Sequence, residues 1–305
     1  MNGLRILVTG GAGFIGSNLA NHLADENDVI AIDDEYLGTP DNLAPNVDYR
    51  RQSVLDDDLP TDVDIVFHLA ALSSYAMHED DPCRGVRVNI EGFVNTVRSA
   101  RDSGCDTVVY ASTSSIYGTQ TEPSPVDMPV SVNTAYEASK LGRERYAEYF
   151  NNHYGMQLTG LRLFSVYQGY GGSESHKQRF ANVIAQFADD IASGNPPTLY
   201  GDGTQTRDFV HVDDVVHAFE LASEDELNGV FNVGTGEAHS FNTVVQMIND
   251  HLGTDIDPVY IDNPLPDSVY VHDTCADSTA FQDATGWEPA INLHEGIARV
   301  CAQYE

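Results

Sequence analysis

A glycine-rich stretch near the start of the chain, LVTGGAGFIGSNLA, follows a short apolar run and opens an amphipathic one. Gly10, Gly13 and Gly16 form a G-x-x-G-x-x-G pattern, and Gly11 also lets it be read as G-x-G-x-x-G. Residues without a Cβ allow a tight turn and let backbone N–H groups approach a pyrophosphate at a helix N-terminus. A glycine loop alone is weak evidence, because an ordinary strand–helix turn has the same composition. The strand before it and the helix after it favour a dinucleotide site.

Short apolar runs alternate with longer amphipathic runs through the first half of the chain. The runs typical of buried strands are 4–9, 29–32, 65–69, 107–111 and 158–163, and the helical stretches lie near 14–25, 86–102 and 135–153. This alternation predicts an α/β fold of the Rossmann type, with a doubly wound parallel sheet. We expect residues 1–165 to form this domain and residues 166–305 to form a smaller, interleaved substrate-binding lobe. Further helices are expected near 178–192 and 240–252, and the segment 210–234 is expected to return to the sheet with a strand in 229–236.

The chain is strongly acidic, with 47 Asp and Glu residues, 15 Lys and Arg residues and a formal charge of −32. A field of this sign repels nucleic acid and anionic membrane surfaces, so we expect neither as a partner. The hydrophobic content of 41% predicts a folded chain. Such a surface is similar to that of halophilic proteins, which fold in molar salt where the Debye length is about 3 Å. We therefore expect folding to depend on high salt.

The cysteines and the first residues indicate the cellular setting. The four cysteines are far apart and form no C-x-x-C pattern, so neither a metal site nor a disulfide framework is predicted. The N-terminal sequence MNGLRILVTG leads straight into a strand, and no apolar run approaches about 18 residues. These features predict a cytoplasmic protein without a membrane segment.

An acidic residue follows the second predicted strand, where a dinucleotide places its adenosine ribose. In VIAIDDEYLG, Asp33 ends the strand and Asp34 stands beside it. A carboxylate there accepts both ribose hydroxyls and repels a 2′-phosphate, and no arginine is close in the sequence, so we expect NAD rather than NADP. The stretch FHLAA (67–71) supplies small residues where the backbone passes close to the cofactor. Core packing explains its histidine, His68, equally well.

The expected chemical centre combines a strand end with the start of a helix. The run VVYASTSSIYG places hydroxyls at 112–115, at the carboxyl edge where ligands bind. In NTAYEASKL, Tyr136 and Lys140 are spaced i, i+4 and share one helix face. Thr134 and Glu137 form a plausible capping box, which puts Tyr136 in the first turn. The helix end, the ammonium and a nicotinamide cation would lower the Tyr136 pKa from about 10, making it a general base for a sugar hydroxyl.

These motifs together resemble the extended short-chain dehydrogenase/reductases, and within them the UDP-glucose 4-epimerase-like, NAD-dependent sugar-nucleotide epimerases. The resemblance covers nearly the whole chain through TGGAGFIGS, HLAA, STSSIYG, YEASK, LRLF, GDGTQTRDFVHVDD and FNVGTG. It implies that Tyr136 takes the proton of the sugar 4-OH while hydride passes from C4 to NAD, with Thr113 and Lys140 completing the catalytic set. Lys140 would also hold the nicotinamide ribose. The implied cofactor-binding residues are Gly10, Gly13, Phe14, Ile15, Gly16, Asp33, Leu69, Ala70, Ala71, Asn89, Tyr136 and Lys140.

The resemblance also helps to distinguish between the reactions that members of the family catalyse. Related dehydratases and decarboxylases carry acidic residues directly after the position of Thr113, whereas this chain has Ser114 and Ser115. That favours C4 epimerisation of a nucleotide-activated hexose of the UDP-glucose/UDP-galactose type. The alternatives are a 4,6-dehydratase, a decarboxylase, a reductase, or a non-catalytic NAD-binding protein of the same fold. Homodimers are common in the family, and a homodimer is expected here.

The implied substrate-binding residues are Thr113, Ser165, Asn182, Tyr200, Arg207 and Thr274. Asp267 stands where the epimerases place a second diphosphate-binding arginine, and Tyr270 replaces the accompanying acid. Ser165 and Ser53 replace a usual asparagine and aspartate. No Lys or Arg occurs between Arg207 and Arg299, so Arg207 is expected to grip the diphosphate alone. Thr274 is small enough to leave room for an N-acetyl group.

Overall fold

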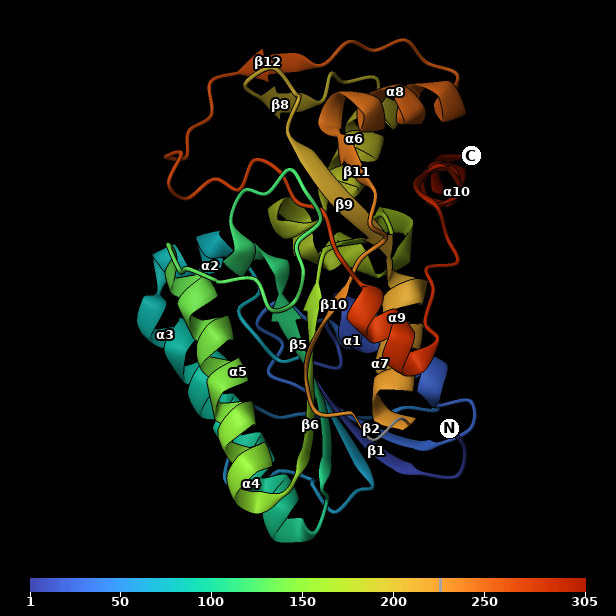
Figure 1. Cartoon of the computed structure of the whole chain (residues 1–305). Coiled ribbons are helices and arrows are strands. Elements are labelled where there is room, and N and C mark those ends of the chain that lie inside the picture. Colours follow the sequence, from blue (N-terminus) through green and yellow to red (C-terminus); the bar gives the residue numbers. More distant parts are fainter. Residues whose placement is uncertain (225–226) are drawn as a thin grey trace.

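Seven parallel strands form the central sheet of the computed structural model, which describes residues 1–224 and 227–305 (Figure 1). The strand order is β3-β2-β1-β4-β5-β6-β10, which runs outward in both directions from β1 as in a doubly wound fold. The α/β fold class is therefore confirmed. The strands are β1 (Arg5–Thr9), β2 (Asp28–Asp33), β3 (Asp48–Arg51), β4 (Ile65–His68), β5 (Thr107–Thr113), β6 (Gln157–Leu163) and β10 (Gly229–Val233).

Helices cover both faces of this sheet (Figure 1). One layer contains α1 (Phe14–Leu23) and α7 (Val212–Glu224), and the other contains α4 (Gly92–Ser103) and α5 (Ala135–Tyr154). Strand β1 contributes side chains to the cores on both faces of the sheet, because successive side chains of a strand point to opposite faces. Ile6 and Val8 are buried in the core beneath α1 and α7, and Leu7 is buried in the core beneath α4 and α5. Burial on both faces explains why the strands are continuous apolar runs.

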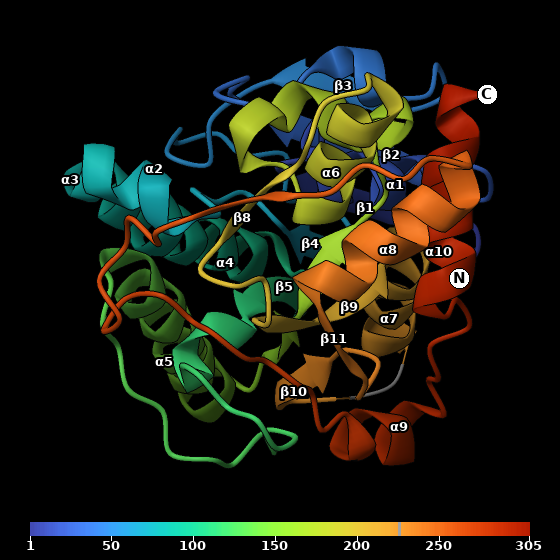
Figure 2. The same cartoon turned by 90° about the horizontal axis from the view of Figure 1, so that it is seen from above.

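The second half of the chain builds a group of elements at one end of the sheet, at the top of Figure 1. Seen from above, α6, α8 and β9 lie over the ends of the central strands (Figure 2). Strand β9 pairs with β7 and β11, and β8 pairs with β12. The elements are β7 (Ser165–Tyr167), α6 (Val183–Ala192), β8 (Thr198–Tyr200), β9 (Thr206–His211), β11 (Ala238–Ser240), α8 (Phe241–Leu252), β12 (Val259–Ile261), α9 (Thr279–Thr285) and α10 (Leu293–Cys301).

The predicted strands and long helices are present, with differences at edges and helix starts. Strand β3 has the polar sequence DYRR and is an edge strand, paired with β2 alone among the described strands, so it shows no apolar run. The helix expected near 86–102 is interrupted: α3 (Pro82–Val86) and a π-helical turn (Arg87–Glu91) precede α4. Helix α2 (Tyr75–Asp80) was not predicted. Across the described ranges, the helices are too short or too polar to cross a membrane.

Candidate active site

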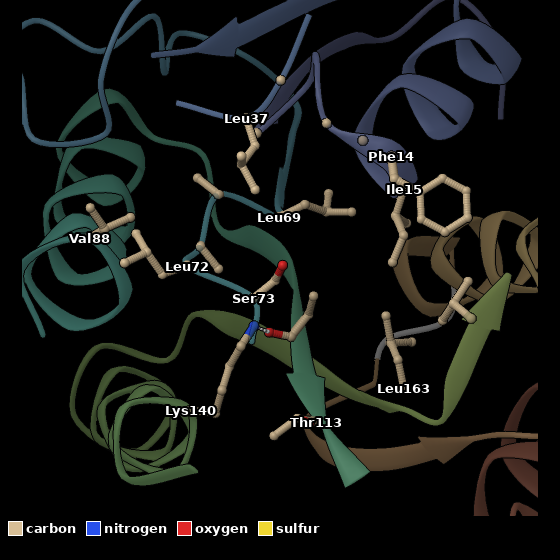
Figure 3. Close-up of a pocket in the computed structure, with 18 of the residues that line it drawn as sticks. Phe14, Ile15, Leu37, Leu69, Leu72, Ser73, Val88, Thr113, Lys140 and Leu163 are labelled. Atoms are coloured by element: carbon tan, nitrogen blue, oxygen red, sulfur yellow. Dashed lines mark hydrogen bonds between the residues drawn. The ribbon is translucent and has the colours of Figure 1, made fainter. Parts of the chain in front are cut away.

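A cavity of about 410 Å³ lies where the carboxyl ends of the central strands meet the second half of the chain. Figure 3 shows Lys140 directed from α5 toward the strand ends, with Thr113 nearby and with Phe14 and Ile15 across the cavity. Most of the predicted site residues line it. These are Gly10, Gly13, Phe14, Ile15, Gly16, Asp33, Leu69, Ala70, Ala71, Thr113, Tyr136, Lys140, Ser165, Arg207 and Thr274.

The glycine loop fits a pyrophosphate. Gly10 has φ +67°, and a Cβ there would lie 2.6 Å from the backbone nitrogen of Ala70, so both the turn and its contact with the end of β4 require glycine. Helix α1 starts directly after Gly13, and no side chain caps it. Because Phe14 and Ile15 line the cavity, the unpaired N–H groups of the first turn are available to an anion.

Asp33 lies at the end of β2 and faces the same cavity. Its carboxylate accepts hydrogen bonds from the backbone N–H of Ala12 (3.2 Å) and Glu35 (2.8 Å). Burial raises its pKa to about 6, and the neighbouring Asp34 contributes in the same direction. A ribose diol would supply hydroxyl donors to this carboxylate.

An arginine also lines this end of the cavity, although none is close to Asp33 in the sequence. Arg84 of α3 forms an ion pair with Asp34 at 3.2 Å. Its guanidinium lies 4.0 Å from the centroid of the Tyr36 ring. No arginine is close to Asp33 in the sequence, but the fold brings Arg84 of α3 in from about fifty positions along the chain. The charge of Arg84 is offset by Asp34, and the Asp33 carboxylate would remain available to a ribose.

The three predicted catalytic residues all line the cavity. Thr113 is the last residue of β5, and Tyr136 and Lys140 lie in the first turns of α5. The capping box of Thr134 and Glu137 is confirmed, with both of its hydrogen bonds present. The Lys140 Nζ donates to the carbonyl oxygen of Ala111 at 3.1 Å and lies 5.9 Å from the centroid of the Tyr136 ring.

The protein's own groups raise the pKa of Tyr136, whereas the predicted lowering also included a nicotinamide cation. Burial of the phenol raises it, which outweighs the opposing effects of the Thr113 hydroxyl and the Arg143 charge. Burial and Arg143 also lower the pKa of Lys140. The protein groups therefore do not produce a phenolate by themselves, and the positive charge of an oxidised nicotinamide would be needed in addition.

Arg143 is a residue of this centre that was not predicted. It is fully buried and donates to three carbonyl oxygens, of Asn89 (3.2 Å), Ala111 (3.1 Å) and Ala70 (3.0 Å). Tyr136, Lys140 and Arg143 are spaced i, i+4, i+7 and share one face of α5, a signal that the sequence did contain. In the part of the chain that is described, no carboxylate pairs with Arg143.

Three predicted binding residues lie outside the cavity lining. Asn89 is buried in the π-helical turn, where its amide bonds both backbone groups of Leu72 (2.8 and 3.0 Å). Asn182 caps α6 and donates to Ser165 Oγ at 3.0 Å. Tyr200 ends β8, with its ring 6.3 Å from that of Tyr270. Their contacts with cofactor or substrate remain predictions.

Arg207 faces the cavity, but its guanidinium already has partners. It donates to the carbonyl oxygens of Thr206 (2.7 Å), His272 (2.8 Å) and Val271 (2.5 Å). It therefore ties β9 to the segment around Val271, a role that the sequence did not reveal. The unexpected lining residues include Tyr36, Ser73, Arg84, His176, Lys177 and Val271.

A protein-family comparison identifies this arrangement. The model described as the NAD dependent epimerase/dehydratase family matches residues 6–234. The chain belongs to this family. Members of the family named after different reactions are similar to it over nearly the whole of this chain. A UDP-glucose 4-epimerase of Mycolicibacterium smegmatis is 35% identical over 310 residues, which cover 97% of each chain. UDP-glucuronic acid decarboxylase 6 of Arabidopsis thaliana is 27% identical over 306 residues, which cover 96% of this chain and 87% of the relative.

A solved structure of another epimerase has the same fold. It is the UDP-N-acetylglucosamine 4-epimerase from Methanobrevibacter ruminantium, in complex with UDP-N-acetylmuramic acid. The TM-score is 0.92 at 29% identity, covering 100% of this chain and 99% of that one. The resemblance to extended short-chain dehydrogenase/reductases of the epimerase type is thus confirmed. NAD is the cofactor of this epimerase/dehydratase family, and the glycine loop, Asp33 and Lys140 are the residues that would hold it.

Proposed function

We propose that the protein inverts C4 of a nucleotide-activated hexose of the UDP-glucose/UDP-galactose type through a transient 4-keto sugar. The similarity to UDP-sugar epimerases supports this reaction. The convergence of Thr113, Tyr136 and Lys140 on one cavity supports it as well.

The residues that line the cavity favour one of the family's reactions over the others. Among the described residues that line it, the carboxylates are Asp33 and Asp34, both at the ribose end. Beside Thr113 stand the hydroxyls of Ser114 and Ser115, which also line the cavity. Elimination of water needs a further acid or base at that position, and neither serine has a suitable pKa. Epimerisation at C4 needs one group that takes the 4-OH proton and returns it, together with the hydride acceptor that bound NAD would supply.

Each residue has a definite task in this reaction. Tyr136 accepts the proton of the 4-OH and returns it after the sugar has turned its other face. Thr113 shares the hydrogen bond to the same oxygen. Lys140 has three N–H donors, of which one is used by Ala111, so others are available to a ribose hydroxyl. Bound NAD would supply the hydride acceptor and donor.

Turnover assays in molar KCl with a panel of nucleotide sugars test the proposal. UDP-glucose and UDP-galactose should interconvert without net NADH release, and Tyr136→Phe should lower kcat by about 10²- to 10⁴-fold while NAD remains bound. Release of CO₂ from a UDP-uronic acid, or a deoxysugar product, would favour a decarboxylase or dehydratase instead. Retention of NAD with no turnover of any sugar would favour a non-catalytic protein.

Thr274 bears on the sugar that is accepted. It lines the cavity and is small, which supports acceptance of N-acetylhexosamines. The M. ruminantium structure belongs to an epimerase named for such a substrate. Comparable kcat/KM for the plain and N-acetylated sugars is expected. Turnover of the plain hexose alone would remove this part of the proposal.

A homodimer is also part of the proposal. Three tyrosines on α5, Tyr146, Tyr149 and Tyr154, are 42–46% exposed. Such a group of exposed aromatic side chains is typical of an interface. Light scattering in molar KCl should give twice the chain mass of 33.3 kDa, and a monomer mass would contradict it.

A further inference from the structure

Both lysines of this chain line the same cavity, and the catalytic set uses only Lys140. Lys177 belongs to a short 3-10 helix, Ser175–Phe180, that precedes α6. Its side chain is 19% exposed, and its Nζ lies 5.0 Å from the centroid of the ring of Phe14, the first residue of α1. The second lysine is therefore held beside the helix start that follows the glycine loop.

The segment around Lys177 is fastened to the first half of the chain. Gln168 and Asn18 of α1 exchange two side-chain hydrogen bonds, at 2.9 and 3.2 Å. His176 Nδ1 lies 3.1 Å from the side-chain nitrogen of Asn42. Both contacts precede Lys177 in the sequence, and they connect the segment to α1 and to the turn at Asn42, which keeps the lysine close to the glycine loop.

The ion pair of Lys177 with Glu174 does not account for its position. The Nζ–Oε1 distance is 3.8 Å, beyond a hydrogen bond. The buried carboxylate of Glu174 already accepts from the backbone N–H groups of Gln168, Gly169 and Asn182, at 2.8, 2.9 and 3.0 Å. Within the described ranges, the Lys177 ammonium has no hydrogen-bond acceptor. Burial lowers its pKa, and a bound anion would favour its charged form.

Each of the other Lys and Arg side chains of the cavity lining already has an acceptor in the protein, and the remaining N–H groups of Lys140 are assigned to the nicotinamide ribose. Lys140 donates to Ala111, Arg84 pairs with Asp34, and Arg207 donates to carbonyl oxygens. A pyrophosphate at the start of α1 would carry two negative charges and would meet backbone N–H groups there. Lys177 is the cation that is both close to this helix start and without a hydrogen-bond acceptor in the described structure.

We propose that Lys177 completes the pyrophosphate site of NAD by donating to a phosphate oxygen beside the first turn of α1. The inference rests on the family's cofactor and not on the proposed C4 epimerisation. It explains why a chain that has almost no lysine keeps its second one in this cavity. An ammonium with three donors suits a phosphate oxygen.

Binding measurements on NAD-free protein in molar KCl test the proposal without turnover. Lys177→Met should weaken the binding of NAD and ADP-ribose, which both contain the pyrophosphate, by roughly 10- to 100-fold. Adenosine and UDP should bind within about twofold of wild type, since neither uses this site. Lys177→Arg should recover part of the loss because it restores the charge.

Arg179 provides the matched control. It lies in the same short helix, its side chain is 74% exposed, and its partner Asp80 is 3.7 Å away. Arg179→Met makes the same charge change and should leave NAD binding unaltered. Equal NAD affinities for Lys177→Met and Arg179→Met would overturn the proposal. Weaker UDP binding with unchanged NAD binding would also overturn it, by assigning Lys177 to the substrate diphosphate.

A measurement on the wild-type chain covers the case in which the variant fails to fold. Lys177 can be followed by mass spectrometry during acetylation, because only one other lysine competes. ADP-ribose should protect Lys177 from acetylation, and adenosine and UDP should not. Acetylation at the same rate with and without ADP-ribose would refute the contact.

Discussion

Lys140 and Arg143 donate to the same acceptor, the carbonyl oxygen of Ala111, each at 3.1 Å. Both side chains are buried at the end of β5, one helical turn apart on α5. Two basic side chains thus stand near Tyr136. Burial lowers the pKa of Lys140, and Arg143 lowers it further. The same Arg143 charge favours the phenolate of Tyr136.

Removing the charge of Arg143 should therefore shift the pH dependence of turnover. Tyr136 acts as a base only when deprotonated, so activity rises with pH through its pKa. Arg143→Gln should raise that pKa and shift the rising part of the kcat–pH profile to higher pH by about one pH unit. Arg143→Lys keeps the charge, so kcat should rise at nearly the same pH as in the wild type. If a folded, active Arg143→Gln variant showed the same rise at the wild-type pH, Arg143 would have a structural role alone.

The affinity for NAD should fall in mild acid because of Asp33. Its pKa is raised to about 6 in the protein, first by burial, so the carboxylate is protonated below that pH. Only the charged form accepts both ribose hydroxyls. The Kd of NAD should therefore increase about tenfold between pH 7 and pH 5. Titration calorimetry at both pH values measures this, with Asp33→Asn as the control that binds weakly and without the pH dependence. A pH-independent Kd for the wild type would show that Asp33 does not contact the ribose.

A buried ion pair behind the site should be essential for stability. Arg162 donates to both carboxylate oxygens of Glu144, at 3.0 and 2.8 Å, and both residues are buried. Glu144→Gln leaves the guanidinium without its counter-charge and should lower the free energy of unfolding by about 3–5 kcal/mol. Denaturant titration in molar KCl measures this.

An exposed pair on the same helix provides the comparison. Arg145 and Glu148 are 3.1 Å apart, with side chains 68% and 60% exposed. Glu148→Gln should change the free energy of unfolding by less than about 1 kcal/mol. Equal losses for Glu144→Gln and Glu148→Gln would contradict the importance of the buried pair.

The charge of −32 should make the folded state depend on salt. Raising KCl from 0.1 M to 1 M shortens the Debye length from about 10 to about 3 Å and weakens the repulsion between surface carboxylates. The thermal midpoint measured by circular dichroism should therefore rise steadily with KCl. The same midpoint at low and molar KCl would refute the proposal of a salt-dependent fold.

The parts of the site that local spacing specifies were predictable. The glycine loop, Asp33 and the Tyr136–Lys140 pair each lie within one strand–helix turn or one helix face. Arg84 and Lys177 reach the cavity through contacts between distant segments, which no local pattern records. The hydrogen bonds of Arg207 to carbonyl oxygens could not be predicted either. The sequence around an arginine does not show whether its guanidinium binds backbone carbonyl groups or a phosphate.

The same distinction holds for the fold. Apolar runs predicted the central strands because both of their faces are buried. Strand β3 was missed because an edge strand with the sequence DYRR carries no such run. The start of α4 was misplaced because the π-helical turn at Arg87–Glu91 has the composition of ordinary helix.

Transfer of a deuterium label tests the central claim most directly. UDP-glucose labelled with deuterium at C4 is incubated with the purified protein in molar KCl, and the products are read by NMR and mass spectrometry. A 4-epimerase that passes through a 4-keto sugar should yield UDP-galactose with the deuterium still at C4, because the same hydride leaves and returns. Loss of the label to solvent, or no inversion of any nucleotide sugar at C4, would contradict the proposed function.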